Sequence, residues 1–454
     1  MITEVTRHKN LLRVLMFPWL ALGHILPFLR LAKKLVDRGF IIYLLSTSVN
    51  LNLTKKKITE KYLRLIQLIE LHLPELPELP SYLWTTNALP PHLNMVLQRA
   101  LKMAKGTLSK ILQNLRLTLV IVDLLLQWAE KVALETGTPS VKLLTSGAAV
   151  LAYMWTVNKL LGDEFLFEAI YLRKLELEKL SELLAQSAKD KERTDAFPFA
   201  VAYSNIMLMS TSRLIEATYI DYLMKFANWK VVPVGAPVQD PIADDADEME
   251  LIDWLGKKDE NSTVFVSFGS EYFLSKEDRE EIAFGLELSN VNFIWVARFP
   301  KGEEQNLEDA LPKGFLERIG DRGRVLDKFA PQPRILNHPS TGGFISHCGW
   351  NSVMESVDFG VPIIAMPIHL DQPMNARLIV ELGVAVEIVR DDYGKIHREE
   401  IAEILKDVIA GKSGENLKAK MRDISKNLKS IRDEEMDTAA EELIQLCKNS
   451  PKLK

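Results

Sequence analysis

A histidine and an aspartate stand where reactive groups are often placed in α/β proteins. His24 follows Gly23 shortly after the apolar run at residues 11–17, at a predicted strand-to-helix turn, and Asp123 directly follows the apolar run at residues 117–122. Near pH 7 a neutral imidazole can take a proton from an alcohol, and an aspartate beside it would fix the tautomer and stabilise the imidazolium. The same two residues could serve only as a polar helix start and a strand-end cap, so both interpretations stay open at this point.

The stretch from residue 329 to residue 372 carries the most specific pattern in the chain. A predicted strand at 341–346 runs into a turn of small residues, and a helix is predicted at 351–359. The free N–H groups of a helix start bind anions. Side chains suited to an anion, a ribose or a sugar lie near this turn, namely His347, Asn351, Ser352, Glu355, Asp371 and Gln372. The alternative for each residue taken singly is that it caps a helix in an ordinary α/β turn.

The order and spacing of this stretch resemble the donor-binding signature of plant UDP-dependent glycosyltransferases, and the resemblance extends over the whole chain. It is strongest for the branch-forming members, which add a sugar to a sugar of a glycoside, including steviol glycosides. The resemblance implies a UDP-sugar as the donor, with no metal and no further cofactor. A closing glutamine such as Gln372 usually accompanies members that use UDP-glucose.

The resemblance also implies roles for single residues of the donor site. Phe329 would stack on the uracil, where the family usually has a tryptophan, and Ala330 and Gln332 would meet the base and the ribose. Glu355 would hold the ribose hydroxyls. The remaining contacts would come from Ser270, His347, Asn351 and Ser352 on the diphosphate and from Trp350, Asp371 and Gln372 on the sugar.

The motif Gly23-His24-x-x-Pro27 resembles the catalytic-base motif of the same family, which favours the catalytic interpretation of His24 and Asp123. His24 would deprotonate a hydroxyl of the acceptor, and that oxygen would displace UDP from the anomeric carbon, with the departing charge held by the helix start and His347. One displacement inverts this carbon, so the product would be a β-glycoside, with a β-1,2 branch expected. An acceptor pocket is expected on loops of the first half, lined by Trp19, Leu22, Thr85, Asn87, Leu126, Thr145 and Ser146.

Strand and helix patterns alternate along both halves of the chain, which predicts two α/β domains of Rossmann type. The resemblance implies the GT-B fold, in which two such domains face each other across a cleft. The charged, helical stretch within 163–198 predicts one or two surface helices, a candidate lid. The expected domains are an acceptor-binding domain at 1–228, a linker at 229–250, a UDP-sugar-binding domain at 251–430 and a helix at 431–454 that returns to the first domain.

The composition narrows the class of protein. The 454 residues are 47% apolar and 26% charged, and the net charge of −5 argues against sequence-independent binding of nucleic acid. Two cysteines fit a reducing compartment, and the absence of a signal-peptide core or a long apolar run favours a cytosolic protein without a membrane span. Monomer is the expectation from the family. The sole Asp-x-Asp, at 245–247 in the acidic linker, is interpreted as a solvated charge run and not as a metal site.

Other functions stay open on the sequence alone. The same fold and base could act on an aglycone hydroxyl or with another UDP-sugar. Leucine is more than twice as frequent in the first 200 residues as in the rest, which fits either a helix-rich apolar half or a redesigned one. A redesigned acceptor half would leave a protein that binds a UDP-sugar with little turnover.

Overall fold

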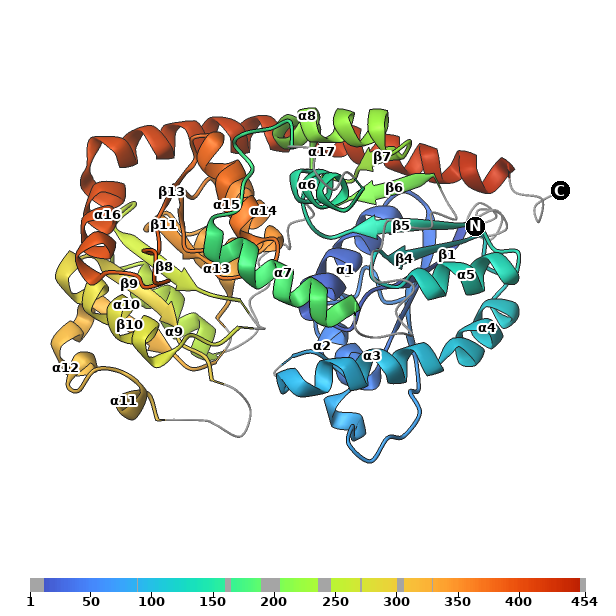
Figure 1. Cartoon of the computed structure of the whole chain (residues 1–454), viewed down its shortest axis with the longest axis horizontal. Helices are drawn as coiled ribbons and strands as arrows, with labels where there is room; N and C mark the ends of the chain where they lie inside the picture. Colours follow the sequence, from blue (N-terminus) through green and yellow to red (C-terminus); the bar gives the residue numbers. More distant parts are fainter. Residues whose placement is uncertain are drawn as a thin grey trace. The chain divides into compact units, whose positions relative to one another are not determined.

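The computed structural model describes residues 12–87, 89–159, 165–188, 205–235, 246–269, 272–299, 306–328 and 330–449. The chain divides into two compact units, each containing one parallel sheet (Figure 1). Unit 1 consists of Met1–Ala148, Lys191–Pro237 and Ile431–Lys454, and unit 2 consists of Ala149–Asp190 and Val238–Ser430. Each unit is described by itself below.

The sheet of unit 1 has the strand order β3-β2-β1-β4-β5-β6-β7, with all neighbours parallel. Its strands are β1 (Leu12–Phe17), β2 (Phe40–Ser46), β3 (Ile66–Glu70), β4 (Leu119–Asp123), β5 (Ser140–Leu144), β6 (Ile206–Met209) and β7 (Lys230–Pro233). Because β1 pairs with both β2 and β4, the strand order reverses between β1 and β4. Ligands of open α/β sheets bind beyond the carboxyl ends of the strands at such a reversal.

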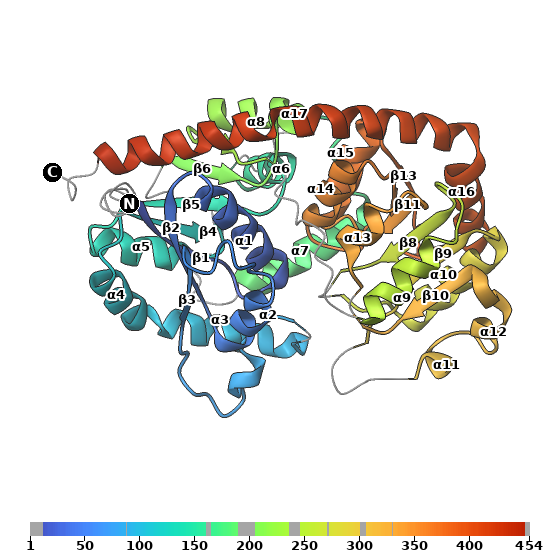
Figure 2. The ribbon, with the colours of Figure 1, turned by 180° about the vertical axis from the view of Figure 1, so that it is seen from behind.

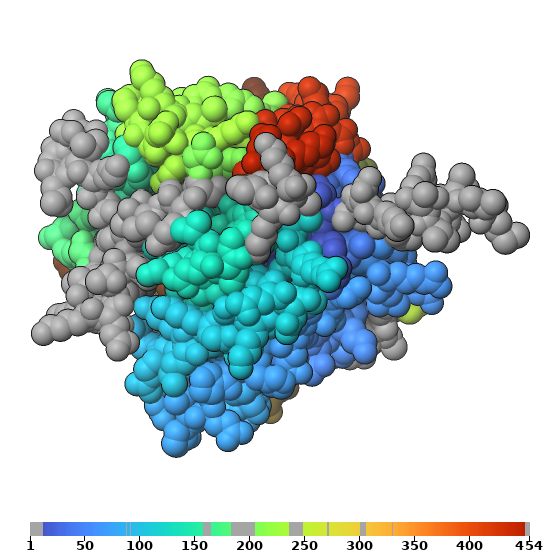
Figure 3. Space-filling model, turned by 90° about the vertical axis from the view of Figure 1, so that its right-hand side faces the viewer, coloured from blue at the N-terminus to red at the C-terminus, as the bar shows by residue number. Residues whose placement is uncertain are grey.

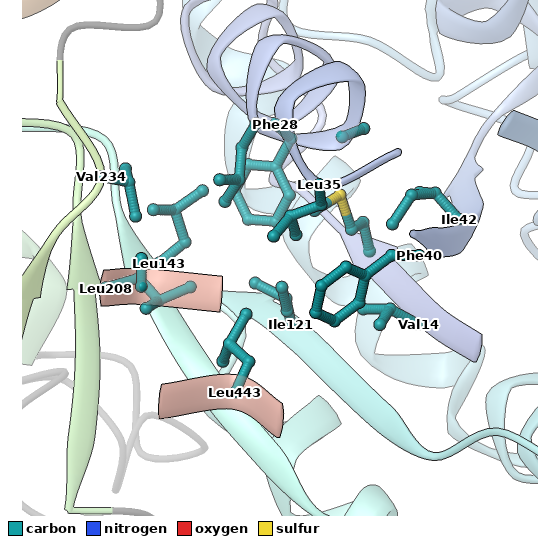
Figure 4. Packing of buried hydrophobic residues seen from close by; sticks show 14 of the residues in the cluster. Val14, Phe28, Leu35, Phe40, Ile42, Ile121, Leu143, Leu208, Val234 and Leu443 are labelled. Carbon is teal, nitrogen blue, oxygen red and sulfur yellow. The ribbon is translucent and has the colours of Figure 1, made fainter. Parts of the chain in front are cut away.

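Helices cover this sheet and close its core. They are α1 (Leu22–Val36), α2 (Ser48–Lys55), η2 (Ser81–Leu83), η3 (Pro91–Leu93), α3 (Asn94–Met103), α4 (Lys105–Asn114), α5 (Gln127–Glu135) and α8 (Arg213–Phe226). One face of the sheet packs against α1, where Phe28 and Leu35 meet Val14 and Ile121 in a fully buried cluster (Figure 4). The apolar positions of α1 recur at helical spacing, so one face of the helix supplies these contacts.

The last helix, α17 (Lys412–Asn449), contributes its final turns to unit 1. Leu443 is fully buried in the same cluster as Ile121, as Figure 4 shows. Earlier in α17, Glu435 accepts hydrogen bonds from the buried Ser212 hydroxyl and from the Arg213 backbone N–H at the start of α8. Figure 3 shows this end of α17, in red, beside the yellow-green α8.

The sheet of unit 2 has the order β10-β9-β8-β11-β12-β13, again with all neighbours parallel. Its strands are β8 (Thr263–Ser267), β9 (Asn292–Val296), β10 (Gly323–Leu326), β11 (Thr341–Ser346), β12 (Ile363–Ala365) and β13 (Ala385–Glu387). The strand order reverses between β8 and β11, so the carboxyl ends of these strands are the expected ligand site of this unit.

The helices of unit 2 flank this sheet, with α10 and α16 packed together on one side (Figure 2). A Cβ at Gly285 of α10 would lie 2.6 Å from Ile401, so glycine permits this close approach. The helices are α7 (Lys174–Ala188), α9 (Ala246–Leu255), α10 (Lys276–Ser289), α11 (Leu307–Ala310), α12 (Phe315–Ile319), η4 (Gly320–Arg322), α13 (Gln332–Leu336), α14 (Trp350–Phe359), α15 (Gln372–Glu381) and α16 (Arg398–Ala410). Helix α6 (Ala148–Lys159) begins at the last residue of the first stretch of unit 1 and continues in unit 2.

The predicted linker at 229–250 differs from the structure at both ends. β7 lies inside it and pairs with β6 as the edge strand of the first sheet, and α9 begins before it ends. The two valines of β7, which stand before a proline- and acid-rich stretch, give only a weak strand signal because the run is too short to show a strand pattern. Residues 149–190, expected in the first domain, belong to unit 2, and the part of the candidate lid that is described is α7.

Candidate active site

The candidate catalytic pair lies at the strand reversal of unit 1. His24 is the third residue of α1, which follows β1, and Asp123 is the last residue of β4. His24 Nδ1 lies 2.8 Å from Asp123 Oδ2. The histidine side chain is 27% exposed whereas the aspartate is 1% exposed, so the imidazole is the member of the pair that solutes can reach. The sequence-predicted pair is therefore brought together, with the histidine outward.

Backbone groups fix the orientation of the Asp123 carboxylate. Its Oδ1 accepts a hydrogen bond from the Leu125 N–H at 3.0 Å, and its Oδ2 accepts one from the Trp19 N–H at 3.2 Å. A carboxylate held in this way accepts from protonated Nδ1 of His24, which leaves Nε2 unprotonated and able to take a proton. This arrangement is the one that a general base requires.

Thr145 is a partner of the candidate base that the sequence did not identify as such. Its Oγ1 lies 3.1 Å from His24 Nδ1, at the carboxyl end of β5, the strand next to β4. Shortly after it, the Ala148 N–H donates to the carboxylate of Glu216 at 2.8 Å, and Glu216 is fully buried. A buried carboxylate thus holds the start of α6, just beyond the turn that carries Thr145.

Two of the residues predicted to line an acceptor pocket are core residues instead. Leu126 is 1% exposed within the apolar cluster beneath α5, and Thr85 is 2% exposed. Thr85 Oγ1 accepts a hydrogen bond from the Asn87 N–H, as a residue that stabilises a turn does. Thr145 is also buried, at 8% exposed, whereas the other candidates are partly exposed, namely Trp19, Leu22, Asn87 and Ser146.

The candidate donor site of unit 2 consists of three turns at one edge of the sheet. They follow β8, β11 and β12, which are neighbours in the sheet, at residues 268–269, 347–349 and 366–371. Helix α14 begins directly after Gly349, a residue with no side chain to cap the first N–H groups. Backbone N–H groups of this kind, with the positive end of the helix dipole, form an anion site.

Two glycines enclose the imidazole of His347. A Cβ at Gly269 would lie 2.7 Å from His347 Nε2, and a Cβ at Gly349 would lie 2.5 Å from the same atom, so neither position accepts a larger residue without movement. Gly269 also has a φ of +78°, which disfavours other residues. Burial, with a smaller effect of nearby His369, lowers the pKa of His347 to about 4. His347 is therefore neutral at pH 7 and offers a hydrogen bond to an anion, as the donor role predicted from the sequence requires.

The pKa of His347 predicts a specific dependence of stability on pH. Between its ordinary value near 6.5 and about 4, the unfolded chain binds a proton that the folded chain does not. Folding stability should therefore decline as the pH falls through this range, by on the order of 2 kcal/mol from this residue. The measurement is chemical unfolding from pH 7 to pH 4 for the wild type and for His347→Asn, and the variant should show the weaker decline. An equal decline of folding stability in the two proteins would contradict the lowered pKa of His347.

Gln332, Ser352 and Glu355 form a polar group between α13 and α14. Gln332 Nε2 donates to Glu355 Oε2 at 2.8 Å and to Ser352 Oγ at 3.3 Å. Glu355 is only 4% exposed, so its carboxylate is a fixed acceptor at the inner end of this group. The three residues that the family resemblance assigns to the ribose and the diphosphate are thus in mutual contact, although the sequence did not indicate the bonds between them.

Replacing Glu355 should weaken the binding of UDP. In Glu355→Ala the ribose loses its acceptor and Gln332 loses its main partner, which should raise the dissociation constant of UDP on the order of 10-fold to 100-fold. Isothermal titration calorimetry with UDP measures this change. Glu381→Ala, at the end of α15, is a control that should bind UDP as the wild type does. Unchanged affinity in Glu355→Ala would place the ribose site elsewhere.

The turn after β12 is built around the side chain of Gln372. Its Oε1 accepts hydrogen bonds from the N–H groups of Ile368 at 3.1 Å and His369 at 3.2 Å, so Nε2 is the end that can donate to a sugar hydroxyl. Asp371 Oδ2 accepts from Asn375 Nδ2 at 3.2 Å, which orients the carboxylate. The predicted sugar-binding pair thus starts α15 with one oriented acceptor and one oriented donor.

Cys348 and Leu370 have positive φ values of 64° and 58°, one in the turn after β11 and one in the turn after β12. Such values cost energy for residues other than glycine and asparagine. The Cys348 N–H donates to Ser346 Oγ, and its carbonyl accepts from Asn375, so the surrounding bonds hold the turn in place. Backbone strain at both turns supports a functional role for them.

Several residues predicted from the sequence are either buried in the core, partly exposed, or outside the described residues. Phe329, Ser270 and Asp245 are outside the described residues. Trp350 is 3% exposed, so its indole is a core group at the start of α14. Ala330 and Asn351 are partly exposed.

Within the described part of the chain, no group of three or more His, Cys, Asp or Glu side chains is placed to hold a metal ion. None of the helices in the described ranges is both long and apolar enough to cross a membrane.

Comparison with known proteins gives matches over both units. Residues 152–429 match the family described as UDP-glucoronosyl and UDP-glucosyl transferase, and residues 10–235 match the glycosyltransferase N-terminal domain. The chain is 52% identical over 437 residues to a β-D-glucosyl crocetin β-1,6-glucosyltransferase of Gardenia jasminoides, covering 95% of this chain and 98% of the relative. It is 47% identical to a mogroside IIIx synthase of Siraitia grosvenorii, covering 96% and 93%. A UDP-glycosyltransferase 91D2 of Stevia rebaudiana is 33% identical, covering 93% and 92%.

Solved structures resemble the whole chain. A Siraitia grosvenorii glycosyltransferase in complex with UDP superposes with a TM-score of 0.78 at 26% identity, over 95% of this chain and all of that one. UGT2 of Phytolacca americana, complexed with UDP-2-fluoroglucose and pterostilbene, gives a TM-score of 0.73 at 28% identity over 96% of this chain and all of that one. The fold is therefore GT-B, with two Rossmann-like domains, as the sequence predicted.

The family matches, the full-length relatives and the shared fold all agree. The Gardenia jasminoides relative is named for an acceptor that already carries glucose, which fits the sugar-on-sugar branch that the sequence indicated. The chain belongs to the plant family 1 UDP-glycosyltransferases and is an enzyme that transfers a sugar from a UDP-sugar donor.

Proposed function

We propose that this enzyme transfers glucose from UDP-glucose to a sugar hydroxyl of a terpenoid glycoside, with His24 as the general base and inversion at the anomeric carbon. The observation that carries the proposal is the 2.8 Å contact between His24 Nδ1 and the buried Asp123, with the imidazole itself reachable from solution. His24 Nε2 takes the proton of the acceptor hydroxyl while the oxygen forms its bond to the anomeric carbon and the bond to UDP breaks.

The donor side supplies the charge stabilisation in this proposal. The N–H groups at the start of α14 and the neutral His347 donate hydrogen bonds to the diphosphate, whose negative charge grows as UDP leaves. Asp371 accepts from and Gln372 Nε2 donates to hydroxyls of the sugar. Glu355 accepts from the ribose. The closing glutamine favours glucose over other sugars in this account.

The acceptor is proposed to be a glycoside of the steviol type, with the new bond a β-1,2 branch. A second candidate is a β-1,6 bond to the glucosyl group of a glucosyl crocetin, because the Gardenia jasminoides relative at 52% identity carries both terms in its name. The Stevia rebaudiana relative, at 33% identity, is a more distant match. An aglycone hydroxyl as acceptor, another UDP-sugar as donor, and a binding protein with little turnover are the competing functions.

The function is tested by mass spectrometry of reactions with UDP-glucose and either a steviol glycoside, a glucosyl crocetin or the free aglycone of each. A product one hexose heavier from the glycosides alone supports transfer onto a sugar, and methylation analysis of the product separates a 1,2 bond from a 1,6 bond. A product from the aglycones would favour transfer onto an aglycone hydroxyl. If no acceptor gives a product while calorimetry shows that UDP binds, the result would favour a UDP-sugar-binding protein with little turnover.

We propose further that the enzyme acts without a metal, as a cytoplasmic monomer. The helix start and the hydrogen-bond donors of the diphosphate site do the work that a divalent cation does in metal-dependent transferases. The same reaction run with excess EDTA should give an unchanged rate, and a loss of rate that Mg²⁺ restores would contradict the proposal. Sedimentation velocity measures the oligomeric state.

A further inference from the structure

Two arginines and two glutamates form a compact network in unit 2. Arg377 of α15 donates from Nη2 to both carboxylate oxygens of Glu176, at 2.8 Å and 2.9 Å. Arg173 donates to both oxygens of Glu387 at the end of β13, at 2.7 Å and 3.1 Å. Cross-contacts close the group, because Arg377 Nη1 lies 3.2 Å from Glu387 and the Arg173 N–H donates to Glu176 at 2.7 Å.

The network is well shielded from solvent. The side chain of Arg377 is 3% exposed, and those of Glu387 and Glu176 are 11% and 17% exposed. The guanidinium groups of Arg377 and Arg173 also lie 5.1 Å and 5.9 Å from the centre of the Tyr171 ring. Removing the carboxylate of Glu176 leaves the buried Arg377 with Glu387 as the one other glutamate of this network, which is costlier than losing a surface ion pair.

The network joins two segments that the sequence does not relate. Arg173 and Glu176 lie at the start of α7, in the stretch that the sequence predicted as surface helices, whereas Arg377 and Glu387 belong to the donor-binding half. The start of α7 is therefore fixed to α15 and β13 by charge-assisted hydrogen bonds, which are the stronger kind. A freely moving lid would not form such bonds at its base.

The network also reaches the first turn of α15. Arg377 Nη1 donates to the carbonyl of Pro373 at 3.0 Å, and Pro373 directly follows Gln372. Asp371 is oriented by Asn375, one turn further along the same helix. A change in the position of Arg377 thus acts on the turn that presents Asp371 and Gln372.

We propose that Glu176 is a positioning residue for the donor sugar, acting through Arg377 on the first turn of α15. The inference rests on the proposed function only in taking Asp371 and Gln372 as the residues that hold the sugar. The role is specific to the sugar, because the ribose and diphosphate contacts come from α13, α14 and the turns after β8 and β11. Loss of Glu176 therefore impairs the binding of UDP-glucose and leaves the binding of UDP alone unchanged.

The test compares Glu176→Gln with Glu178→Gln, an exposed glutamate of the same helix. Steady-state kinetics at saturating acceptor give KM for UDP-glucose, and product inhibition gives the inhibition constant of UDP. Glu176→Gln should raise KM for UDP-glucose on the order of fivefold with the UDP inhibition constant unchanged, and Glu178→Gln should change neither. Equal rises in both constants, or no rise in either, would overturn the proposal.

Two further variants keep the result interpretable. Arg377→Lys keeps the positive charge but loses the planar guanidinium that donates to both Glu176 and the Pro373 carbonyl. It should show the same rise in KM for UDP-glucose, and it replaces Glu176→Gln in the test if that variant does not fold. Asp371→Asn tests the proposed sugar contact itself. If Asp371→Asn leaves KM for UDP-glucose unchanged, the proposed function fails at this residue, whereas a rise there without a rise in Glu176→Gln rejects the positioning role alone.

Discussion

His24→Ala should lower kcat by on the order of 1,000-fold and leave the affinity for UDP unchanged. The imidazole is the reachable member of the pair with Asp123, and general-base catalysis contributes about 100-fold to 10,000-fold in enzymes. The proposed donor site lies in unit 2 and His24 in unit 1, so the substitution should remove the proposed base without altering the residues proposed to bind UDP. Product formation by mass spectrometry and UDP titration by calorimetry give the two quantities.

The control for this variant is His92→Ala. His92 is an exposed histidine in the same unit, in η3, and its removal should leave kcat at the wild-type value. Turnover of His24→Ala within a few-fold of the wild type would contradict the assignment of the base. A parallel loss of UDP affinity would instead indicate that the substitution has disturbed the fold.

Asp123→Asn should lower kcat by on the order of 100-fold or more. Asparagine can present its amide N–H₂ to His24 Nδ1, which favours the tautomer with a proton on Nε2 and removes the base from the acceptor. It also removes the negative charge that stabilises the imidazolium in the transition state. The measurement is kcat across pH 6 to 9, in which the residual activity should not return to the wild-type value at any pH.

The buried position of Asp123 makes a check of folding necessary. The side chain accepts from the Trp19 and Leu125 N–H groups, and one oxygen of asparagine can accept only part of what the carboxylate accepts. Thermal unfolding and UDP affinity should therefore be measured beside kcat. A folded variant with wild-type UDP affinity and wild-type kcat would show that Asp123 does not act on the base.

Strong local patterns in the sequence predicted the elements that position the site. The apolar run at 11–17 covers β1, and the predicted strand at 341–346 matches β11 at both ends, because each is a short strand followed by a clear turn signal. His24 and Asp123 were predictable as a pair since each follows such a strand, and the carboxyl ends of parallel strands share one edge of a sheet.

The partners that complete the site were not predictable from local patterns. Thr145 lies beside His24 although the two are separated by 121 positions, and its hydroxyl gives no periodic signal. The ion pair of Glu176 with Arg377 spans 201 positions, and glutamates are common on exposed helices. The protonation state of His347 also depended on burial, which lowers its pKa and keeps the imidazole neutral at pH 7. Contacts of this kind follow from the tertiary fold alone.

In the proposed mechanism, a base in the first unit promotes a single displacement at the anomeric carbon. The most direct test is proton NMR of the product made from UDP-glucose, which carries its glucose in the α configuration, and a glycoside acceptor. If His24 promotes a single displacement, the new glycosidic bond should be exclusively β and its formation should be lost in His24→Ala. An α-linked product, or a β-linked product formed at the wild-type rate by His24→Ala, would contradict it.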